Sequence, residues 1–488
     1  MTNISYRTLD MYRAGFYDDF QNNSLHGPPS EGRSMATAVN TDYKLAPNND
    51  KLDHIPGSFG WPIIGHTFPL VKDLYGTIDK QYKEFGPVSR FGLAGFKGVL
   101  LVGPDLYKEV YLDRDKNFSA EMGYMGSLGR FYKGALLLRD HEEHRFQRRM
   151  MQTAFKNDAM KGYIGTMGPM IGEAVEAWGK NKEMLFFPAI KQTLLDVASE
   201  IFVGLDKDDS RADELNTAFL DIADGLMGIV TKEIPGTKYA KGKKAERFLK
   251  EFFGKLIGER RAGNGIDTFT FFTKEKTEEG EYFSDEDIVA HMSFLLFAAH
   301  DTTTSALSHL LFHLGQNPEL QQRLREEAQA IDKDFMEYED LEKMPLAEAA
   351  TKEALRLHPS VMMMQRRTIN ECELGGFKIP ANTILFMAPQ HTHRMGEYWD
   401  APLKFDIDRW LEPRNEHKRH SFSFVGFGGG GHKCIGMHFA LMQVKNFLHQ
   451  FLRRYEFRLA DNFSDKMQTV PLPKPVDDLP IVLTPISK

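Results

Sequence analysis

The stretch that decides the fold is Phe427-Gly-Gly-Gly-Gly-His-Lys-Cys-Ile-Gly436, in which four glycines shortly precede one of the chain's two cysteines. Glycine runs disfavour helix and strand, so Gly428–Gly431 predict a turn with positive φ angles or a close backbone approach. Apolar residues recur at helical spacing from Ile435 to about Tyr455. Cys434 is therefore expected at a helix N-terminus, where unpaired N–H groups favour the metal-binding thiolate.

Three other interpretations of this segment fit less well. A cysteine beside glycines commonly just packs in a core. A zinc site would draw on His432, Cys434 and His438, but a structural zinc site needs four ligands and the chain contains no Cys-x2-Cys pair. A phosphate loop requires serine or threonine after the lysine, whereas Cys434 follows Lys433. A single thiolate beside an open turn is how some proteins hold haem iron.

The pattern Phe-x2-Gly-x-His-x-Cys-x-Gly resembles the haem-binding loop of the cytochrome P-450 family. The resemblance makes Cys434 the ligand of the iron, with Phe427, Gly430 and Gly436 at the other fixed positions of the motif. His432 stands where most members carry an arginine that faces a haem propionate, and sterol-demethylase-like members are similar in using histidine there. The implied cofactor is haem b, iron protoporphyrin IX.

Composition is compatible with a large enzyme. The 488 residues are 42% hydrophobic and 12% aromatic, enough to bury a large core. Two cysteines exclude a disulfide scaffold and suit a reducing, cytoplasmic environment. The net charge of −7 argues against nucleic acid as a partner. No apolar run approaches the roughly 20 residues of a membrane span, so we expect a cytoplasmic protein without a transmembrane anchor.

The chain is expected to comprise an N-terminal extension, residues 1–50, and one cytochrome P-450 domain, residues 51–488. The extension is rich in Asn, Ser, Gly and Pro, and an apolar patch near its start predicts a short helix that docks on the main body or contacts a membrane peripherally. Pro56–Gly65 resembles the proline-rich connector of eukaryotic-type family members. Short strands are predicted near residues 88–91 and 99–102, with a glycine turn at Gly95 between them that would make them a hairpin. The resemblance implies a mainly α fold with smaller β sheets and a long central helix over the haem.

That long helix is predicted from Ser284 to about Gly315. Ser284 and Asp287 form a pattern similar to a capping box, and apolar positions continue to the glycine. About 31 residues at 1.5 Å each span roughly 45 Å, enough to cross a domain.

The middle of this helix contains Ala298-Ala-His-Asp-Thr-Thr-Thr-Ser305. An acid next to a hydroxyl in apolar surroundings is costly to bury unless it is used. The segment resembles the family's oxygen-activation motif, with Ala299 in place of glycine. The resemblance makes Asp301 and Thr302 catalytic residues that relay protons.

Glu353 and Arg356 lie three positions apart in a helix predicted to begin near Pro345, so they share one face. Spacing alone predicts a surface ion pair worth under about 1 kcal/mol. The pair also matches the family's Glu-x-x-Arg motif, and Arg409 lies in a segment similar to the one whose arginine completes a buried triad. The resemblance implies that the three residues are structural and hold the cysteine loop in place.

Haem propionates need cationic partners, for which arginine is well suited. His144 and Arg148, one helical turn apart, resemble a family pair above one haem edge. Arg366 lies at the usual offset for a strand arginine, but its neighbour Arg367 is an alternative. His432 is the remaining candidate.

By resemblance, the substrate pocket is lined by uncharged residues from four segments of the chain. Such a lining suits a sterol, terpenoid or other isoprenoid better than a fatty acid or polar molecule, although methionine is also ordinary core filler. The residues are Tyr124, Met125, Phe131, Phe294, Phe297, Ala298, Val361, Met362, Met363, Met364, Val470 and Leu472.

We therefore expect a haem-thiolate monooxygenase that inserts one oxygen atom from O2 into a C–H bond of an apolar small molecule. Two alternatives remain open: a peroxide-using or isomerising haem-thiolate enzyme, and a non-catalytic haem-binding sensor. The paired Asp301 and Thr302 argue against both.

Electrons should come from a separate protein, because the chain has no Rossmann fingerprint, flavin domain or iron–sulfur cysteine set. Basic residues near the cysteine or the haem edge are Arg145, Arg149, His417–His420 and Lys433. They favour an acidic ferredoxin, served by its own NAD(P)H reductase, as the donor.

Overall fold

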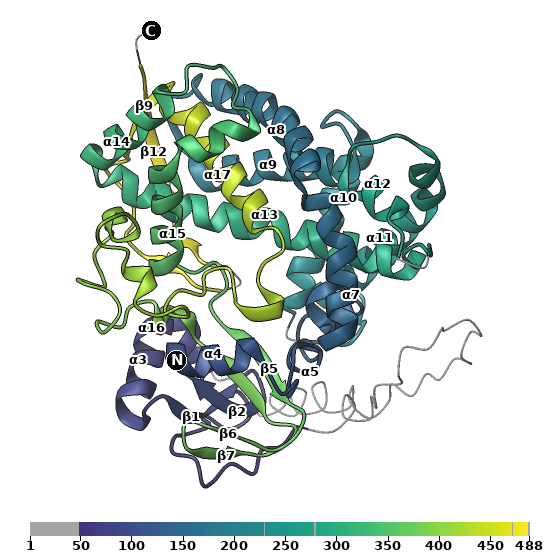
Figure 1. The fold of residues 1–488 in the computed structure, drawn as a ribbon, viewed down its shortest axis with the longest axis vertical. Helices are drawn as coiled ribbons and strands as arrows, with labels where there is room; N and C mark the ends of the chain where they lie inside the picture. The colour runs from purple at the N-terminus through teal and green to yellow at the C-terminus, as the bar shows by residue number, and fades with distance from the viewer. Residues whose placement is uncertain (1–47, 229, 278–279, 471, 487–488) are drawn as a thin grey trace.

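The structure is a computed structural model that describes residues 48–228, 230–277, 280–470 and 472–486. Helices make up most of it, and the two larger sheets lie toward opposite ends of the molecule (Figure 1). The mainly α fold with smaller sheets is confirmed. The helix expected near the chain's start lies outside the described residues, and the division at residue 50 stays a prediction.

The helices include several that begin at the positions expected from sequence. In chain order they are α2 (Thr67–Lys72), α3 (Leu74–Phe85), α4 (Pro104–Leu112), α5 (Ala120–Tyr124), α6 (Gly129–Tyr132), α7 (His141–Met151), α8 (Asn157–Trp178), α9 (Phe186–Ala198), α10 (Ser210–Leu226), α11 (Lys238–Ala262), α12 (Thr268–Lys274), α13 (Asp285–Gly315), α14 (Pro318–Gln329), α15 (Pro345–Leu357), α16 (Pro389–Thr392) and α17 (Met437–Leu452).

The main sheet has five strands in the order β1-β2-β8-β5-β3, and a second sheet has the order β4-β12-β9. The expected hairpin is confirmed and longer than predicted, since β1 and β2 pair from Val88 opposite Leu101 to Leu93 opposite Phe96. Strands β6 with β7, and β10 with β11, form two-stranded sheets. The strands are β1 (Val88–Leu93), β2 (Phe96–Leu101), β3 (Phe118–Ser119), β4 (Glu183–Leu185), β5 (Met364–Thr368), β6 (Cys372–Leu374), β7 (Phe377–Ile379), β8 (Ile384–Met387), β9 (Tyr455–Leu459), β10 (Met467–Gln468), β11 (Lys474–Pro475) and β12 (Pro480–Pro485).

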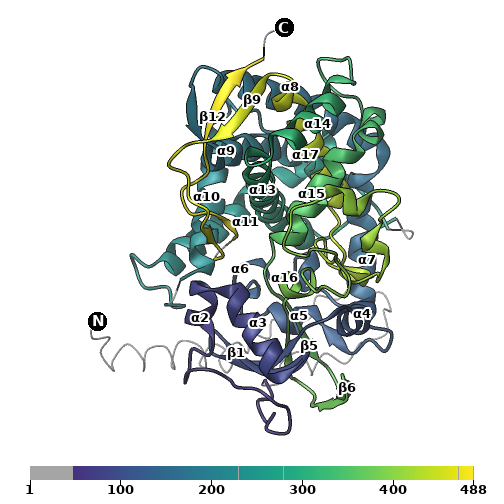
Figure 2. The same cartoon turned by 90° about the vertical axis from the view of Figure 1, so that its left-hand side faces the viewer.

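Helix α13 runs through the centre of the helical part in both views (Figures 1 and 2) and packs against α9, α11 and α15. Its 31 residues match the predicted length. The Ser284 hydroxyl accepts a hydrogen bond from the Asp287 N–H at 3.1 Å, as expected of the N-cap. A capping box also needs the Asp287 carboxylate to accept the Ser284 N–H. That part of the prediction is wrong, because the carboxylate instead binds Arg139 and also Gln147 of α7.

A buried ion network joins α15 to the segment that follows α16. The fully buried Glu353 carboxylate accepts hydrogen bonds from Arg356 at 2.8 and 2.9 Å, from Arg409 at 3.0 Å and from the Trp410 indole at 3.0 Å. Arg409 also pairs with buried Glu416 at 2.5 Å. The prediction of a surface pair from spacing alone is wrong, because the segment after α16 covers both side chains: the Pro402 carbonyl accepts from Arg356 at 2.7 Å, and the Asp406 N–H donates to Glu353 at 2.9 Å.

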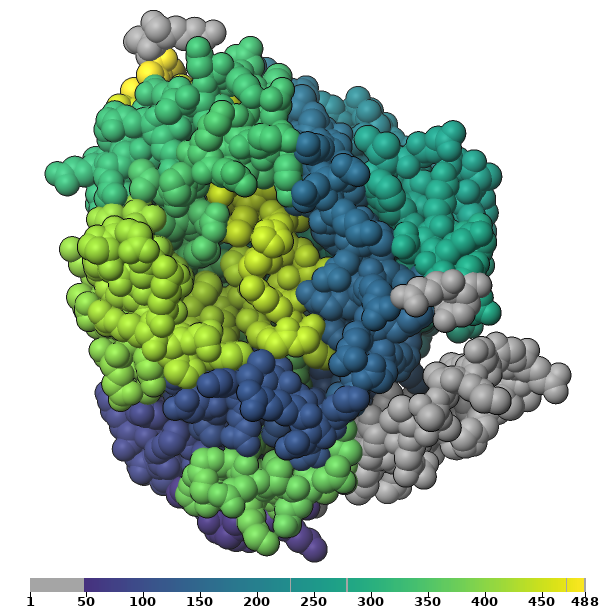
Figure 3. Space-filling view, in the orientation of Figure 1, coloured from purple at the N-terminus to yellow at the C-terminus, as the bar shows by residue number. Residues whose placement is uncertain are grey.

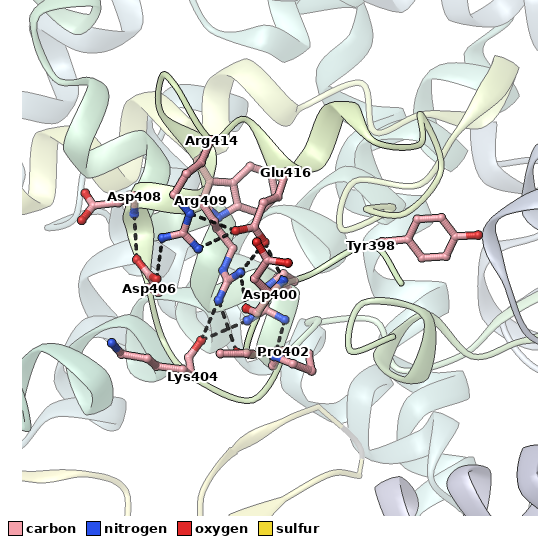
Figure 4. Close-up of polar contacts among 12 residues, drawn as sticks. Tyr398, Asp400, Pro402, Lys404, Asp406, Asp408, Arg409, Arg414 and Glu416 are labelled. Carbon is pink, nitrogen blue, oxygen red and sulfur yellow. Dashed lines mark hydrogen bonds and ion pairs between the residues drawn. The ribbon is translucent and has the colours of Figure 1, made fainter. Parts of the chain in front are cut away.

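The remaining donors of the two arginines bind backbone carbonyls. Arg356 donates to the carbonyls of Pro402 at 2.7 Å and Lys404 at 3.2 Å, and Arg409 donates to that of Asp400 at 2.8 Å (Figure 4). Glu353 and Glu416 thus offset the charges of Arg356 and Arg409, and the loop backbone satisfies the remaining donors of these two arginines. Arg414, which is partly exposed, adds a third guanidinium that bonds Glu416 at 3.0 Å and Asp406 at 2.7 Å.

His393 connects this network to the cysteine loop. Its Nδ1 lies 3.2 Å from the Arg356 carbonyl, and its Nε2 accepts the Val425 N–H at 2.9 Å. Burial and the nearby Arg356 guanidinium lower the pKa of His393 to about 3. The imidazole therefore stays neutral and can accept the hydrogen bond that fixes the chain two residues before Phe427.

Glu353→Ala should leave the buried Arg356 guanidinium without a counter-charge and deprive Arg409 of one of its two carboxylate partners, which should lower the free energy of unfolding by about 3 to 5 kcal/mol. Chemical denaturation measures this. Arg323→Ala is the matched control, since Arg323 pairs with Asp408 at 2.7 Å in the same region but both side chains are about half exposed. Its loss should cost under about 1 kcal/mol. Equal losses in the two variants would contradict the importance of the buried network.

Candidate functional site

The glycine loop before Cys434 is shaped by a close backbone contact. Gly428 and Gly430 have φ angles of 69° and 59°, as the sequence predicts for this turn. A Cβ atom added at Gly430 would lie 1.7 Å from the carbonyl oxygen of Tyr111 in α4. The Cys434 N–H donates to the Phe427 carbonyl at 2.8 Å and closes the loop.

The Cys434 thiol faces an enclosed space. Burial raises its pKa, although the Gly436 N–H and the cations Arg148 and Lys433 act in the opposite direction. The expectation that the helix N-terminus by itself favours a thiolate is wrong, because burial is the larger effect and α17 starts only at Met437. The side chain is nonetheless solvent-accessible. A thiol that is both surrounded by protein atoms and accessible to solvent borders an internal hollow.

Four basic side chains gather beside this hollow. The rings of His144 and His432 stack with centroids 3.8 Å apart. Burial lowers the pKa of His144 to about 4 and that of His432 well below its usual range, and the charges of Arg148 and Arg366 lower both further. Among the described residues neither arginine forms an ion pair. Neutral imidazoles and unpaired arginines in one place fit the two carboxylates of a haem.

Arg366 and Arg367 are neighbours on β5, and only one of them lies in the basic cluster. The Arg366 guanidinium lies 5.7 Å from the centre of the Tyr111 ring, on the side of the glycine loop. Arg367 points elsewhere, and its Nε donates to the Asn382 carbonyl at 3.1 Å. The alternation of side chains along a strand separates the two residues, so Arg366 is the one that joins the basic cluster.

The middle of α13 brings together the acid and the hydroxyl. The Thr302 hydroxyl donates to the Ala298 carbonyl at 2.8 Å. The Asp301 carboxylate lies 3.0 Å from the Lys191 ammonium and 3.2 Å from His300 Nε2. Burial raises the pKa of Asp301, but these two partners outweigh it and bring the pKa down to about 2. Lys191, on α9, could not be found from the sequence, because only the fold places it opposite the acid.

Of the segments predicted to line the pocket, two are hydrogen-bonded to α13, and the one that contains Tyr124 is joined to β5. The Ser360 hydroxyl donates to the Thr302 carbonyl at 2.9 Å, which places the stretch before β5 next to the helix. The Ser305 hydroxyl donates to the Pro473 carbonyl at 2.6 Å and holds the C-terminal turn there. The Gln365 N–H donates to the Tyr124 hydroxyl at 3.1 Å, so α5 joins the same region.

The individual lining residues differ in where they lie. Phe294 and Phe297 contact the ring of Tyr132, with centroids 5.3 and 5.0 Å away, and sequence analysis missed this tyrosine. Phe131 instead packs on Tyr239 with centroids 5.4 Å apart. Among the others, Met362 and Met364 are buried in hydrophobic clusters, Val361 is 42% exposed, and those of intermediate burial are Met125, Ala298, Met363, Val470 and Leu472.

Comparison with known proteins agrees with this geometry. The family model for cytochrome P450 matches residues 55–479, and the chain belongs to this family. Cytochrome P450 136 of Mycobacterium tuberculosis is 35% identical, covering 98% of each chain. Taxane 10-beta-hydroxylase of Taxus cuspidata is 27% identical, covering 88% of this chain and 90% of that one. A solved structure of retinoic acid-bound cyanobacterial CYP120A1 superposes with a TM-score of 0.80 at 26% identity, covering 88% and 99% of the two chains.

Membership of the family defines the class of chemistry. The protein is a cytochrome P450 monooxygenase whose cofactor is the iron protoporphyrin IX haem. It uses O2 and takes electrons from an external donor. Across the described residues, every helix is too short or too polar to cross a membrane.

Gly430→Ala should strongly reduce the yield of folded protein and its haem content, because the new methyl group clashes with the Tyr111 carbonyl at a positive φ angle. Absorbance of bound haem and thermal unfolding measure the two effects. Gly431→Ala is the control, since a Cβ there meets nothing within 4 Å. If both variants behaved like the parent, the contact would not constrain the loop.

Proposed function

We propose that this cytochrome P450 hydroxylates a terpenoid or related isoprenoid and receives its electrons from an acidic protein donor. The observation that carries the proposal is an accessible thiol beside an unpaired basic cluster, in a fold whose central helix α13 carries partly accessible apolar side chains. Two of the similar proteins support the substrate class. One is named a taxane hydroxylase, and the other was solved with retinoic acid bound, and both ligands are isoprenoids.

We assign cofactor binding to the residues around the hollow. Cys434 would hold the iron, and His144, Arg148, Arg366 and His432 would bind the propionates. Phe427, Gly430 and Gly436 shape the loop that presents the thiol. Haem bound here supplies the activation of O2 that C–H hydroxylation needs.

The proton-handling residues would be Asp301 and Thr302. The Thr302 hydroxyl donates its hydrogen to the Ala298 carbonyl at 2.8 Å, which leaves its oxygen lone pairs available to accept a hydrogen bond. Rotation of the hydroxyl would exchange the bond to Ala298 for one toward the haem side. The Asp301 carboxylate is ionised at neutral pH and is held by Lys191, whose side chain is 24% exposed. Lys191 thereby links the interior carboxylate to solvent protons.

The substrate side of α13 is apolar. Phe294, Phe297 and Ala298 are only partly covered although they lie in the central helix, so they border the same internal space. Aromatic and aliphatic walls favour a hydrocarbon skeleton, and a substrate carboxylate placed against them would lose hydration without gaining a partner.

Cys434→Ser should abolish the strongly red-shifted Soret band of the reduced, CO-bound protein, because a serine hydroxyl does not supply thiolate ligation. Absorbance spectroscopy of the purified holoprotein measures this. Cys372→Ser is the control, since burial and the carboxylate of Glu109 raise the pKa of Cys372 to about 11. Loss of the band in the control, or its persistence in Cys434→Ser, would overturn the assigned ligand.

The donor would dock beside the cysteine loop. In Figure 3 the yellow segment around the loop and α17 is exposed at the centre of one face. A cavity of about 550 Å³ next to Gly430–His432 is lined by five arginine or lysine side chains and by one carboxylate, Asp113. The expected role of residues 417–420 is less well supported, since none of the four lines this cavity.

Reversing two charges here should slow electron transfer from an acidic ferredoxin. For the double variant Arg145→Glu and Lys433→Glu we expect a reduction rate at least about tenfold lower at low ionic strength, with the difference shrinking as salt is added. Stopped-flow reduction in the presence of CO measures it. Lys255→Glu, an exposed change on α11, is the control. An unchanged rate in the double variant would rule out this docking face.

A further inference from the structure

A second cavity opens between α6, α10, α11 and the first half of α13. Its volume is about 470 Å³, within the range of pockets that bind small molecules. Apolar side chains, among them Ile222, Leu249 and Val289, form part of its wall, and charged residues such as Lys250 and Glu286 also border it. Neither the cofactor nor the donor assignment uses this cavity.

One stripe of α13 connects the cavity with the proton-handling pair. Ala290 and Ser293 line the cavity, and Phe294, Phe297, Ala298 and Asp301 follow on the same helix face at spacings of three or four residues. Apart from Ser293, these residues keep partial solvent accessibility inside the centre of the protein. The accessible stripe therefore marks a path along the helix from the cavity toward Thr302.

Tyr132 stands midway along this path. It lines the cavity, and its ring packs on Phe294 and Phe297. Its side chain is 1% exposed, and the hydroxyl has no hydrogen-bond partner among the described residues. A buried hydroxyl without a partner is unfavourable relative to one that is satisfied.

The state of the phenol is fixed. Burial raises its pKa well above the usual range, and the carboxylates of Asp301 and Glu246 raise it further. The hydroxyl therefore keeps its hydrogen at any physiological pH and can donate it to an oxygen atom. The Glu246 carboxylate forms ion pairs with the ammonium groups of Lys243 and Lys250, with N–O distances of 2.8 and 2.7 Å.

We propose that Tyr132 is a substrate-binding residue whose hydroxyl donates a hydrogen bond to a hydroxyl or carbonyl oxygen already present on the isoprenoid skeleton. This inference rests on the proposed function and deepens it, because it selects oxygenated isoprenoids over the parent hydrocarbons. It also implies a place in a reaction sequence, since an earlier oxidation or hydration must install that oxygen.

The test compares matched ligands on matched variants. Abietadienol and abietadiene, retinol and its deoxy hydrocarbon, and β-amyrin and its 3-deoxy hydrocarbon are titrated into the holoenzyme, and dissociation constants are read from the spin-state change of the haem. Tyr132→Phe removes only the hydroxyl. Tyr163→Phe is the control, because that buried phenol already bonds the Thr268 hydroxyl at 2.9 Å. Thermal unfolding verifies that both variants are folded.

For at least one pair we expect Tyr132→Phe to weaken binding of the oxygenated member by about three- to tenfold and to leave the hydrocarbon unchanged. Tyr163→Phe should change neither. If oxygenated and plain members bind the parent protein but respond equally to Tyr132→Phe, the role of Tyr132 is overturned while the substrate class stands. If no member of any pair binds the parent protein, both the substrate class and the role of Tyr132 are overturned.

Discussion

The buried carboxylate of Glu353 is the interaction on which the arrangement of the site depends. It accepts hydrogen bonds from Arg356, Arg409 and Trp410, and thereby fastens α15 to the long segment before the cysteine loop. Replacing such a network by apolar packing is often neutral for stability, whereas a half-empty network is very costly. Its value here is positional: through His393 it sets the backbone at Val425, and the loop from there to Cys434 has little freedom left.

The basic cluster near Cys434 carries charge that no carboxylate of the described residues balances, in contrast to the network around Glu353. Arg148 and Arg366 have no carboxylate partner among the described residues, and the stacked His144 and His432 are held neutral by burial and by those charges. Uncompensated buried charge is unfavourable in the protein alone. A dianionic ligand with its carboxylates in this place would relieve it, which couples cofactor binding to the stability of the fold.

Helix α13 serves three regions at once. Its first turn is tied to α7 by Asp287, its centre presents Asp301 and Thr302, and its accessible stripe passes the wall formed by Phe294 and Phe297. Ser360 and Ser305 tie two distant segments to it through hydrogen bonds. A single rigid element thus places Asp301 and Thr302 in a fixed relation to the apolar wall, as the proposed proton-handling and substrate-binding roles require.

The sequence by itself determined the features that depend on local chemistry. The glycine turn at Gly428 and Gly430, the length of α13, the N-cap at Ser284 and the hairpin of β1 and β2 follow from residue preferences and spacing, which act over a few residues. The prediction that Cys434, and not Cys372, is the iron ligand needed only the residues around Cys434 and a family resemblance.

Only the tertiary structure decided which distant residues meet. Local spacing predicted a surface pair at Glu353 and Arg356, and the fold buried it because residues 400–416 lie across that face. The partner of Asp301 on α9, the choice of Arg366 over Arg367, and the position of Tyr132 against Phe294 all depend on contacts between segments far apart in the chain. Burial likewise raises the pKa of Cys434 by more than the N–H group near the start of α17 lowers it. Desolvation depends on everything packed around a group, and no short stretch of sequence encodes that.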